Sequence, residues 1–227
     1  MLQLILGKTG TGKTAVSLKR SVSCAQNGER TILLVPEQFS FEAERSAFSV
    51  LRGTAALRLS VLSFSRLAEN IFRAHGGLAG KRLTDTARVV LMRLALKEMR
   101  DTLTVYESQA EKPGFLNTML DTVEELKQSG TSPETLAAVA RRVEDPQLSL
   151  KLGDIAGVYG AYCALVDRSY ADPLDDLSKA VELARENRFF VGMRIFVDGF
   201  DFFSPPEREM LYTMMEQAEE VSVTLCA

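Results

Sequence analysis

The strongest chemical signal in the chain is a short glycine-rich segment near its start, Gly7-Lys8-Thr9-Gly10-Thr11-Gly12-Lys13-Thr14. It matches the pattern G-x-x-x-x-G-K-[ST] of phosphate-binding loops (P-loops). In these loops glycines let backbone N–H groups converge on an anion, and the following helix adds unsatisfied donors and its positive dipole end. Lys13 would reach the outer phosphates and the Thr14 hydroxyl would bind Mg²⁺. The pattern predicts an ATP–Mg²⁺ site; the alternative is a plain glycine turn between a strand and a helix.

A second oxygen ligand for Mg²⁺ is expected at the end of a buried strand beside the P-loop strand. The run Ile195-Phe196-Val197-Asp198 has this form, so we predict that Asp198 holds the ion opposite Thr14, through water. Hydrolytic P-loop motors usually place a glutamate after this aspartate to orient or deprotonate the attacking water. Here Gly199 occupies the position, and nothing in the spacing obliges Asp201 to replace it. We therefore predict no catalytic residue, and ATP binding with little or no hydrolysis.

The elements around these residues alternate between strand and helix at both ends of the chain. Helices are expected at 13–26 and 39–51, and a capping box at 204–207 opens another, between strand-like apolar runs at 2–6, 31–35, 57–62, 194–198 and 220–226. Runs that are apolar on both faces and separated by helices indicate a buried parallel sheet. We predict an α/β fold, with a P-loop domain formed by residues 1–80 and 190–227.

The middle of the chain differs, because between Thr84 and Arg188 the pattern predicts only helices. Its apolar residues recur at helical spacing, as in the stripe Leu148, Leu152, Ile155, Tyr159, Tyr162 and Val166. Such stripes are typical of a helical core. We therefore predict that residues 81–189 form an all-helical subdomain inserted into the α/β domain.

Composition and charge limit the class of protein. No apolar run approaches the roughly 18 residues of a membrane span, and the start lacks a secretory signal, so we expect a cytoplasmic protein with no membrane partner. The three widely spaced cysteines are expected to be buried free thiols. The segment 45–100 carries 11 basic residues against three acidic ones, in a chain of net charge −3. This excess fits either a nucleic-acid contact or a solvated, arginine-rich helical face.

Four stretches in this order resemble the first RecA-like domain of a superfamily-one helicase of the UvrD/RecB type. They are the P-loop, the segment 32–45 with Val35-Pro36-Glu37-Gln38-Phe39, the segment 61–68 with Leu62-Ser63-Phe64-Ser65-Arg66-Leu67, and Phe196-Val197-Asp198-Gly199-Phe200-Asp201. These stretches are most similar to those of the AddB family, whose members form one of the two subunits of the bacterial AddAB ATP-dependent helicase–nuclease. The resemblance covers essentially the whole chain.

The resemblance implies DNA contacts along two stretches, Gln38-Phe39-Ser40 and Ser63-Phe64-Ser65. An exposed Phe64 would stack on a base; the alternative is a core position. Ser65 stands where relatives have a histidine, and Asp198-Gly199-Phe200-Asp201 stands where active motors have D-E-F-Q. The glutamate and the phosphate-sensing glutamine are therefore both missing.

The resemblance also implies a helicase-like scaffold that processes DNA double-strand breaks for recombinational repair, together with DNA and an AddA-like motor and nuclease subunit. It implies an iron–sulfur cluster and a nuclease domain only in a later part of such a protein. Ending on a strand, without a second RecA-like domain or a glutamine motif before Leu2, the sequence is expected to be a fragment.

Two other functions remain open from the sequence. Val197-Asp198-Gly199-Phe200 is similar to a motif of adenylate-type kinases, which favours a small-molecule P-loop phosphotransferase. Against it, Asp201-Phe202 stand where Pro-Arg would be, and the separation from the P-loop is about twice that of such kinases. The second alternative is a structural module whose P-loop no longer binds nucleotide.

Overall fold

The computed structural model describes residues 1–77 and 81–226, which divide into two compact units. The first unit comprises Met1–Gly77 and Asp176–Ala227, and the second comprises Leu78–Asp175. The division differs from the predicted one at its second boundary, which the sequence placed after residue 189. The first predicted boundary, at residue 80, lies outside the described residues.

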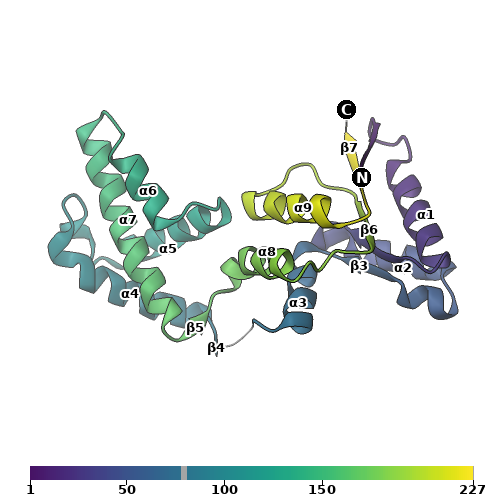
Figure 1. Cartoon of the computed structure of the whole chain (residues 1–227). Coiled ribbons are helices and arrows are strands. Elements are labelled where there is room, and N and C mark those ends of the chain that lie inside the picture. The colour runs from purple at the N-terminus through teal and green to yellow at the C-terminus, as the bar shows by residue number, and fades with distance from the viewer. Residues whose placement is uncertain (78–80, 227) are drawn as a thin grey trace. The chain divides into compact units, whose positions relative to one another are not determined.

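The first unit is a parallel α/β sheet with helices on both faces (Figure 1). Its strands are β1 (Leu2–Gly7), β2 (Arg30–Leu34), β3 (Leu59–Leu62), β6 (Met193–Val197) and β7 (Glu220–Cys226). They are ordered β1-β7-β6-β2-β3, and every neighbouring pair is parallel. The predicted fold class is confirmed.

Side-chain alternation along the strands forms two apolar cores, one on each face of the sheet. In β2, Ile32 and Leu34 face one core, while Leu33 and the following Val35 face the other. The second of these cores is covered by α1 (Lys13–Gln26) and α2 (Ser40–Val50). The first is covered by α3 (Phe64–His75), α8 (Asp176–Glu186) and α9 (Pro205–Gln217).

Helix α8 explains why the α/β unit resumes earlier than the sequence suggested. Its residues Ala180, Val181 and Ala184 are buried in the same core as Phe72 of α3 and Met210 of α9. The helical period alone identified a helix here but not the surface against which it packs.

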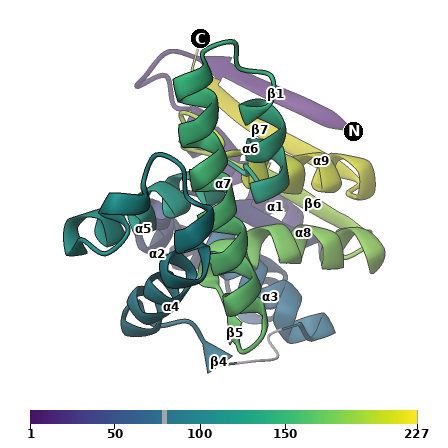
Figure 2. The same cartoon turned by 90° about the vertical axis from the view of Figure 1, so that its left-hand side faces the viewer.

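The second unit is built around its own helical core (Figure 2). Its helices are α4 (Asp85–Met99), α5 (Pro113–Gln128), α6 (Pro133–Ala140) and α7 (Pro146–Asp167). The long helix α7 packs against α4 and α6, and Tyr159, Tyr162 and Val166 of its predicted stripe are buried. The prediction of helices only was incomplete, because β4 (Lys81–Arg82) and β5 (Tyr170–Ala171) pair as short parallel strands.

A set of hydrogen bonds and a set of ion pairs hold the loops of this unit. Both Asp154 carboxylate oxygens accept from the backbone N–H of Thr104, and one also accepts from Val105 and Tyr106, at 2.8–3.1 Å. The buried Lys127 contacts Asp172 at 2.9 Å and Asp175 at 2.7 Å. A buried charge is tolerated when it is paired in this way. Among the described helices, none combines the length and apolar composition needed to cross a bilayer.

Candidate nucleotide site at the carboxyl edge of the sheet

The predicted site residues converge because the strands that carry them are parallel. The P-loop follows β1, Gln38–Ser40 follow β2, Ser63–Ser65 follow β3 and Asp198 follows β6. All four stretches therefore leave the sheet at its carboxyl edge, where open α/β sheets bind their ligands. Segments from the two ends of the sequence thus lie along one edge of the first unit.

The loop conformation requires its glycines. Gly10 and Gly12 have φ angles of 81° and 85°, which residues other than glycine rarely adopt. A Cβ on Gly7 would lie 2.5 Å from the Thr11 hydroxyl oxygen, and that hydroxyl donates to the Lys8 carbonyl at 2.8 Å. The tight turn therefore depends on backbone without side chains at these positions.

The N-terminus of α1 is suited to an anion. Gly12 is its N-cap and supplies no side-chain acceptor, and the first turn contains no acidic residue. The first N–H groups of a helix have no partner within the helix, and they carry its positive dipole end. Lys13 Nζ donates to the carbonyls of Gly7 at 2.7 Å and Lys8 at 2.8 Å, so its ammonium lies over the loop.

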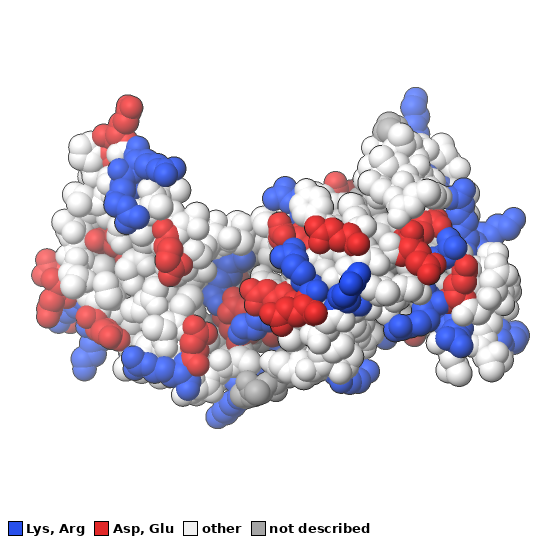
Figure 3. All heavy atoms as spheres, viewed as in Figure 1, with Lys and Arg blue, Asp and Glu red and all other residues white. Residues whose placement is uncertain are grey.

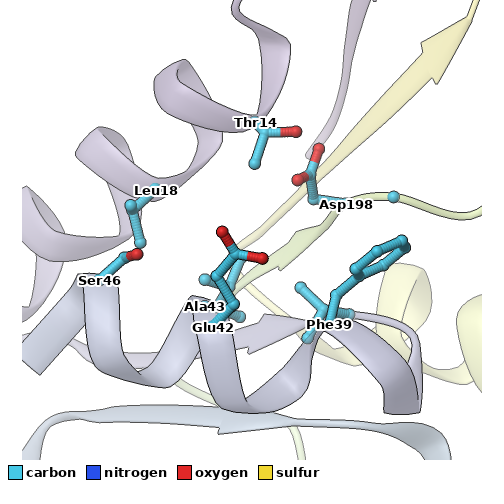
Figure 4. A pocket seen from close by; sticks show the side chains of 10 residues that line it. Thr14, Leu18, Phe39, Glu42, Ala43, Ser46 and Asp198 are labelled. Carbon is cyan, nitrogen blue, oxygen red and sulfur yellow. The ribbon is translucent and has the colours of Figure 1, made fainter.

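Asp198 is held at the end of β6 in a buried position. Its side chain accepts from the Thr224 hydroxyl at 2.5 Å, and its backbone N–H donates to the Leu34 carbonyl at 2.9 Å. Thr14 and Asp198 line the same cavity of about 320 Å³, and in Figure 4 the Thr14 hydroxyl points toward the Asp198 carboxylate. A hydroxyl and a carboxylate are oxygen ligands of the kind that Mg²⁺ prefers.

The expected adjacency of the two strands was wrong. Strand β7 lies between β1 and β6, pairing with both. Its position brings Thr224 to Asp198 and places Cys226 beside the P-loop, 3.5 Å from the Thr9 hydroxyl and 3.8 Å from Lys13 Nζ. Sequence reasoning missed both Thr224 and Cys226 because the order of strands in a sheet is set by tertiary packing.

The prediction of three buried thiols was wrong, since Cys226 is exposed and Cys24 and Cys163 are only partly buried. The hydrogen bond with Thr9 and the charge of Lys13 lower the pKa of this thiol below its usual value. Burial instead raises the pKa of both Cys24 and Cys163 to about 11. Of the three thiols, Cys226 at the loop is therefore the one whose pKa is lowered rather than raised.

The cavity also includes Glu42 of α2, which the sequence did not single out, and Phe39, which the sequence assigned to DNA. Glu42 directs its carboxylate toward the space between Thr14 and Asp198, while Phe39 forms a side of the cavity (Figure 4). A second, more open hollow of about 590 Å³ is lined by Thr9, Gly10, Gly12, Lys13, Thr14 and Asp198, together with Cys226. Thr14 and Asp198 line both hollows, so the P-loop and the aspartate border the same space.

The two stretches assigned to DNA differ in exposure. The Phe39 ring is exposed, and Ser40 Oγ donates to the Glu37 carbonyl at 2.7 Å. Phe64 is only 5% exposed and packs edge-on against Phe200 at 5.3 Å between ring centroids. Stacking on a base needs an accessible ring face, so Phe64 occupies the core position that the sequence left as its alternative.

Other members of these stretches have local roles, and one exposed ring was missed. Ser63 is buried and caps α3 by accepting from the Arg66 N–H at 3.3 Å, and Gln38 and Ser65 are exposed and line none of the described cavities. Phe202, which the sequence did not assign to DNA, is 79% exposed just beyond Asp201.

The basic segment 45–100 is divided between the two units. Arg66 pairs with Glu44 at 3.5 Å and Arg88 with Glu124 at 3.1 Å. On the face in Figure 3, basic and acidic side chains are interspersed. The excess of arginine in sequence therefore does not become one continuous basic surface on that face.

Comparison with known proteins adds the family. The family model described as "ADDB, N-terminal" matches residues 4–227. A protein of Acetivibrio thermocellus, named as a subunit of an ATP-dependent helicase/deoxyribonuclease, is 32% identical over 228 residues. Proteins of the same name from Clostridium botulinum (strain Loch Maree / Type A3) and Clostridium tetani are 30% and 32% identical over 229 and 231 residues. Each match covers 99% of this chain but 20% of the relative, so the chain spans about a fifth of their length. With a family match over nearly all its residues, the chain belongs to the AddB family and corresponds to its N-terminal region.

Proposed function

We propose that this chain is a nucleotide-binding, hydrolysis-poor, helicase-like domain. It would act in an ATP-dependent helicase/deoxyribonuclease that processes DNA double-strand breaks for recombinational repair in the cytoplasm. The observation that carries the proposal is the shared cavity of Thr14 and Asp198, which come from opposite ends of the sequence. The names of the relatives support the same assembly.

Binding would use the loop backbone, Lys13 and the start of α1. The ammonium of Lys13 would exchange the carbonyls of Gly7 and Lys8 for phosphate oxygens, which carry full negative charge. Thr14 and Asp198 would hold Mg²⁺ from two sides, with water completing its octahedron. When bound, the ion neutralises charge on the outer phosphates.

Poor hydrolysis follows from what the site lacks in the described chain. Gly199 has no side chain to orient water, and Asp198 already accepts a hydrogen bond from Thr224. Among the described residues, the other carboxylates that line the two hollows are Glu42 and Asp201, and neither directly follows Asp198 in the chain. Among the described residues, Lys13 is the only basic one that lines either hollow, and no arginine lines them to stabilise charge on the γ-phosphate, so we expect turnover well below ordinary enzymatic rates.

DNA and a motor and nuclease subunit of the AddA type are the proposed partners. Gln38, Phe39 and Ser40 lie at the carboxyl edge, and the exposed rings of Phe39 and Phe202 offer stacking surfaces that accept any base. Because Phe64 is buried, its role in this scheme is packing beneath that edge.

The proposal is tested by equilibrium titration of the chain with ATP and Mg²⁺. Replacing Lys13 by alanine should weaken binding by about 10- to 100-fold, because a charged hydrogen bond contributes about 1.5–3 kcal/mol. Lys19→Ala, which removes an exposed lysine of the same helix, is the matched control and should bind like the wild type. Asp198→Asn should reduce the gain in affinity that Mg²⁺ provides.

Two results would refute this function. Equal ATP affinity of the wild type and Lys13→Ala would mean that the P-loop holds no nucleotide. A steady-state turnover of about 1 s⁻¹ or more by the wild type would contradict poor hydrolysis.

A further inference from the structure

A basic groove lies in the helical unit, outside the nucleotide site. It is a hollow of about 450 Å³ between the end of α4 and the start of α5, with Leu96 and Leu116 among its lining residues. Its charged rim consists of Arg93, Lys97, Arg100, Glu111 and Lys112. We call these five residues and the hollow between them the α4–α5 groove; both helices are labelled in Figure 2.

The spacing of the basic residues places them together. Arg93, Lys97 and Arg100 are four and three residues apart, so they lie on one face of consecutive helical turns. Arg100 pairs with Glu111 at 2.7 Å, and that is the only carboxylate on the described rim. Within the described chain, Arg93, Lys97 and Lys112 form no ion pair.

The basic residues near the end of α4, unpaired within the described chain, differ from the arginine nearer its start. Arg88, more than one turn before Arg93, is neutralised by Glu124 at 3.1 Å. Like charges on one helical face destabilise the helix by a few tenths of a kcal/mol per pair, so an uncompensated cluster has a cost that a bound polyanion would remove. The groove therefore differs from a surface on which positive and negative side chains alternate.

The start of α5 adds to the positive potential. The side chain of the N-cap residue Lys112 does not cap the helix, and the first turn contains no acidic residue. The 16-residue helix thus directs its positive end toward the same groove. Arginine, lysine and a helix N-terminus are the groups that contact phosphate oxygens in protein–DNA complexes.

We propose that the α4–α5 groove binds the sugar–phosphate backbone of DNA without reading its sequence. No aromatic side chain lines the groove among the described residues, so base stacking is not part of the contact. The inference rests on the proposed function for the choice of polyanion, and it assigns to the helical unit a contact independent of the nucleotide site.

The test measures binding of a fluorescently labelled random-sequence duplex, and of one of its strands, to the 227-residue chain by anisotropy at about 50–200 mM salt. Arg93→Ala/Lys97→Ala should weaken duplex binding by about tenfold or more. It should also lower the slope of log affinity against log salt by about two, one for each lost phosphate contact. The control Arg141→Ala/Arg142→Ala removes two exposed basic residues from the same unit and should leave both quantities unchanged.

Each outcome decides the question. Circular dichroism and the ATP titration show that the variants are folded and still bind nucleotide. If the groove variant keeps wild-type affinity and salt slope, the inference is overturned while the proposed function stands; the groove would then suit an acidic protein segment. If the wild type binds neither duplex nor single strand at the lowest salt concentration, both the groove assignment and the DNA contact in the proposed function fail.

Discussion

At the residue scale, Gly199 leaves the position after Asp198 without a side chain and also sets the backbone conformation there. Its φ angle is 82°, and a Cβ there would lie 3.4 Å from Cδ of Pro36. The backbone after Asp198 therefore adopts a conformation that disfavours glutamate at this position. Restoring the residue type found in active motors would not restore its geometry.

We predict that Gly199→Ala lowers the free energy of unfolding by about 1–2 kcal/mol, because alanine disfavours left-handed backbone. Gly199→Asn should cost less, since asparagine tolerates this conformation. Urea titration compares the two. Gly199→Glu should remain as poor an ATPase as the wild type, and a large gain in turnover would show that the loop can rearrange.

A second prediction concerns Cys226. Since its pKa is lowered by Thr9 and Lys13, it should be alkylated by iodoacetamide faster at neutral pH than Cys24 or Cys163, whose pKa values are raised to about 11. The thiolate fraction of the two raised thiols should rise only as the pH approaches that value. ATP–Mg²⁺ should slow alkylation of Cys226, which lines the same hollow as Lys13.

Mass spectrometry of the alkylated cysteines measures this difference, with Cys24 as the internal control. The Lys13→Ala variant should lose both part of the rate advantage and the protection by ATP. Protection of all three cysteines to the same degree would instead indicate a general change in stability.

At the scale of elements, the helical unit depends on a buried ionic cluster that joins α5 to the segment before α8. Burial lowers the pKa of Lys127, but the hydrogen bonds and charges of Asp175 and Asp172 more than offset it, so the net pKa is raised. The side chains of Lys127 and Asp172 are 5% and 1% exposed. Lys127 is the common partner of both carboxylates, so its removal would leave the buried Asp172 carboxylate without a cation.

We predict that Lys127→Ala destabilises the helical unit by about 3–5 kcal/mol, because the Asp172 carboxylate would then be buried without an ion-pair partner. Glu111→Ala removes the exposed Arg100–Glu111 pair, whose side chains are 52% and 70% exposed, and should cost less than about 1 kcal/mol. Urea titration followed by tyrosine fluorescence suits this comparison, because four of the five tyrosines lie in residues 78–175. Equal losses in the two variants would contradict a special role for the buried cluster.

At the scale of the whole molecule, the two units have different chain connectivity. The helical unit is one continuous segment, whereas the sheet interleaves strands from both ends of the sequence in the order β1-β7-β6-β2-β3. Strand β1 has no described partner other than β7, so the P-loop strand is joined to β2 only through β7 and β6.

We predict that residues 78–175 fold as a separate polypeptide, with helical circular dichroism and a cooperative thermal transition. Residues 1–77 alone should not fold, because β6 and β7 are missing from the middle of their sheet. A disordered spectrum for 78–175, or a cooperative transition for 1–77, would contradict this division into units.

The sequence by itself determined the P-loop, the aspartate at the end of β6, the α/β class and the helical stripes, because these depend on local spacing and side-chain period. Even the capping box at Ser204, which starts α9, was predicted from four neighbouring residues. Such features are set by interactions between residues close in the chain.

Only the tertiary structure decided which of these elements meet. It placed β7 between β1 and β6, brought Thr224 to Asp198 and Cys226 to the loop, buried Phe64, and assigned α8 to the α/β core. The physical reason is that strand order and burial depend on contacts between segments far apart in sequence. A local pattern predicts the element but does not identify the surface that covers it.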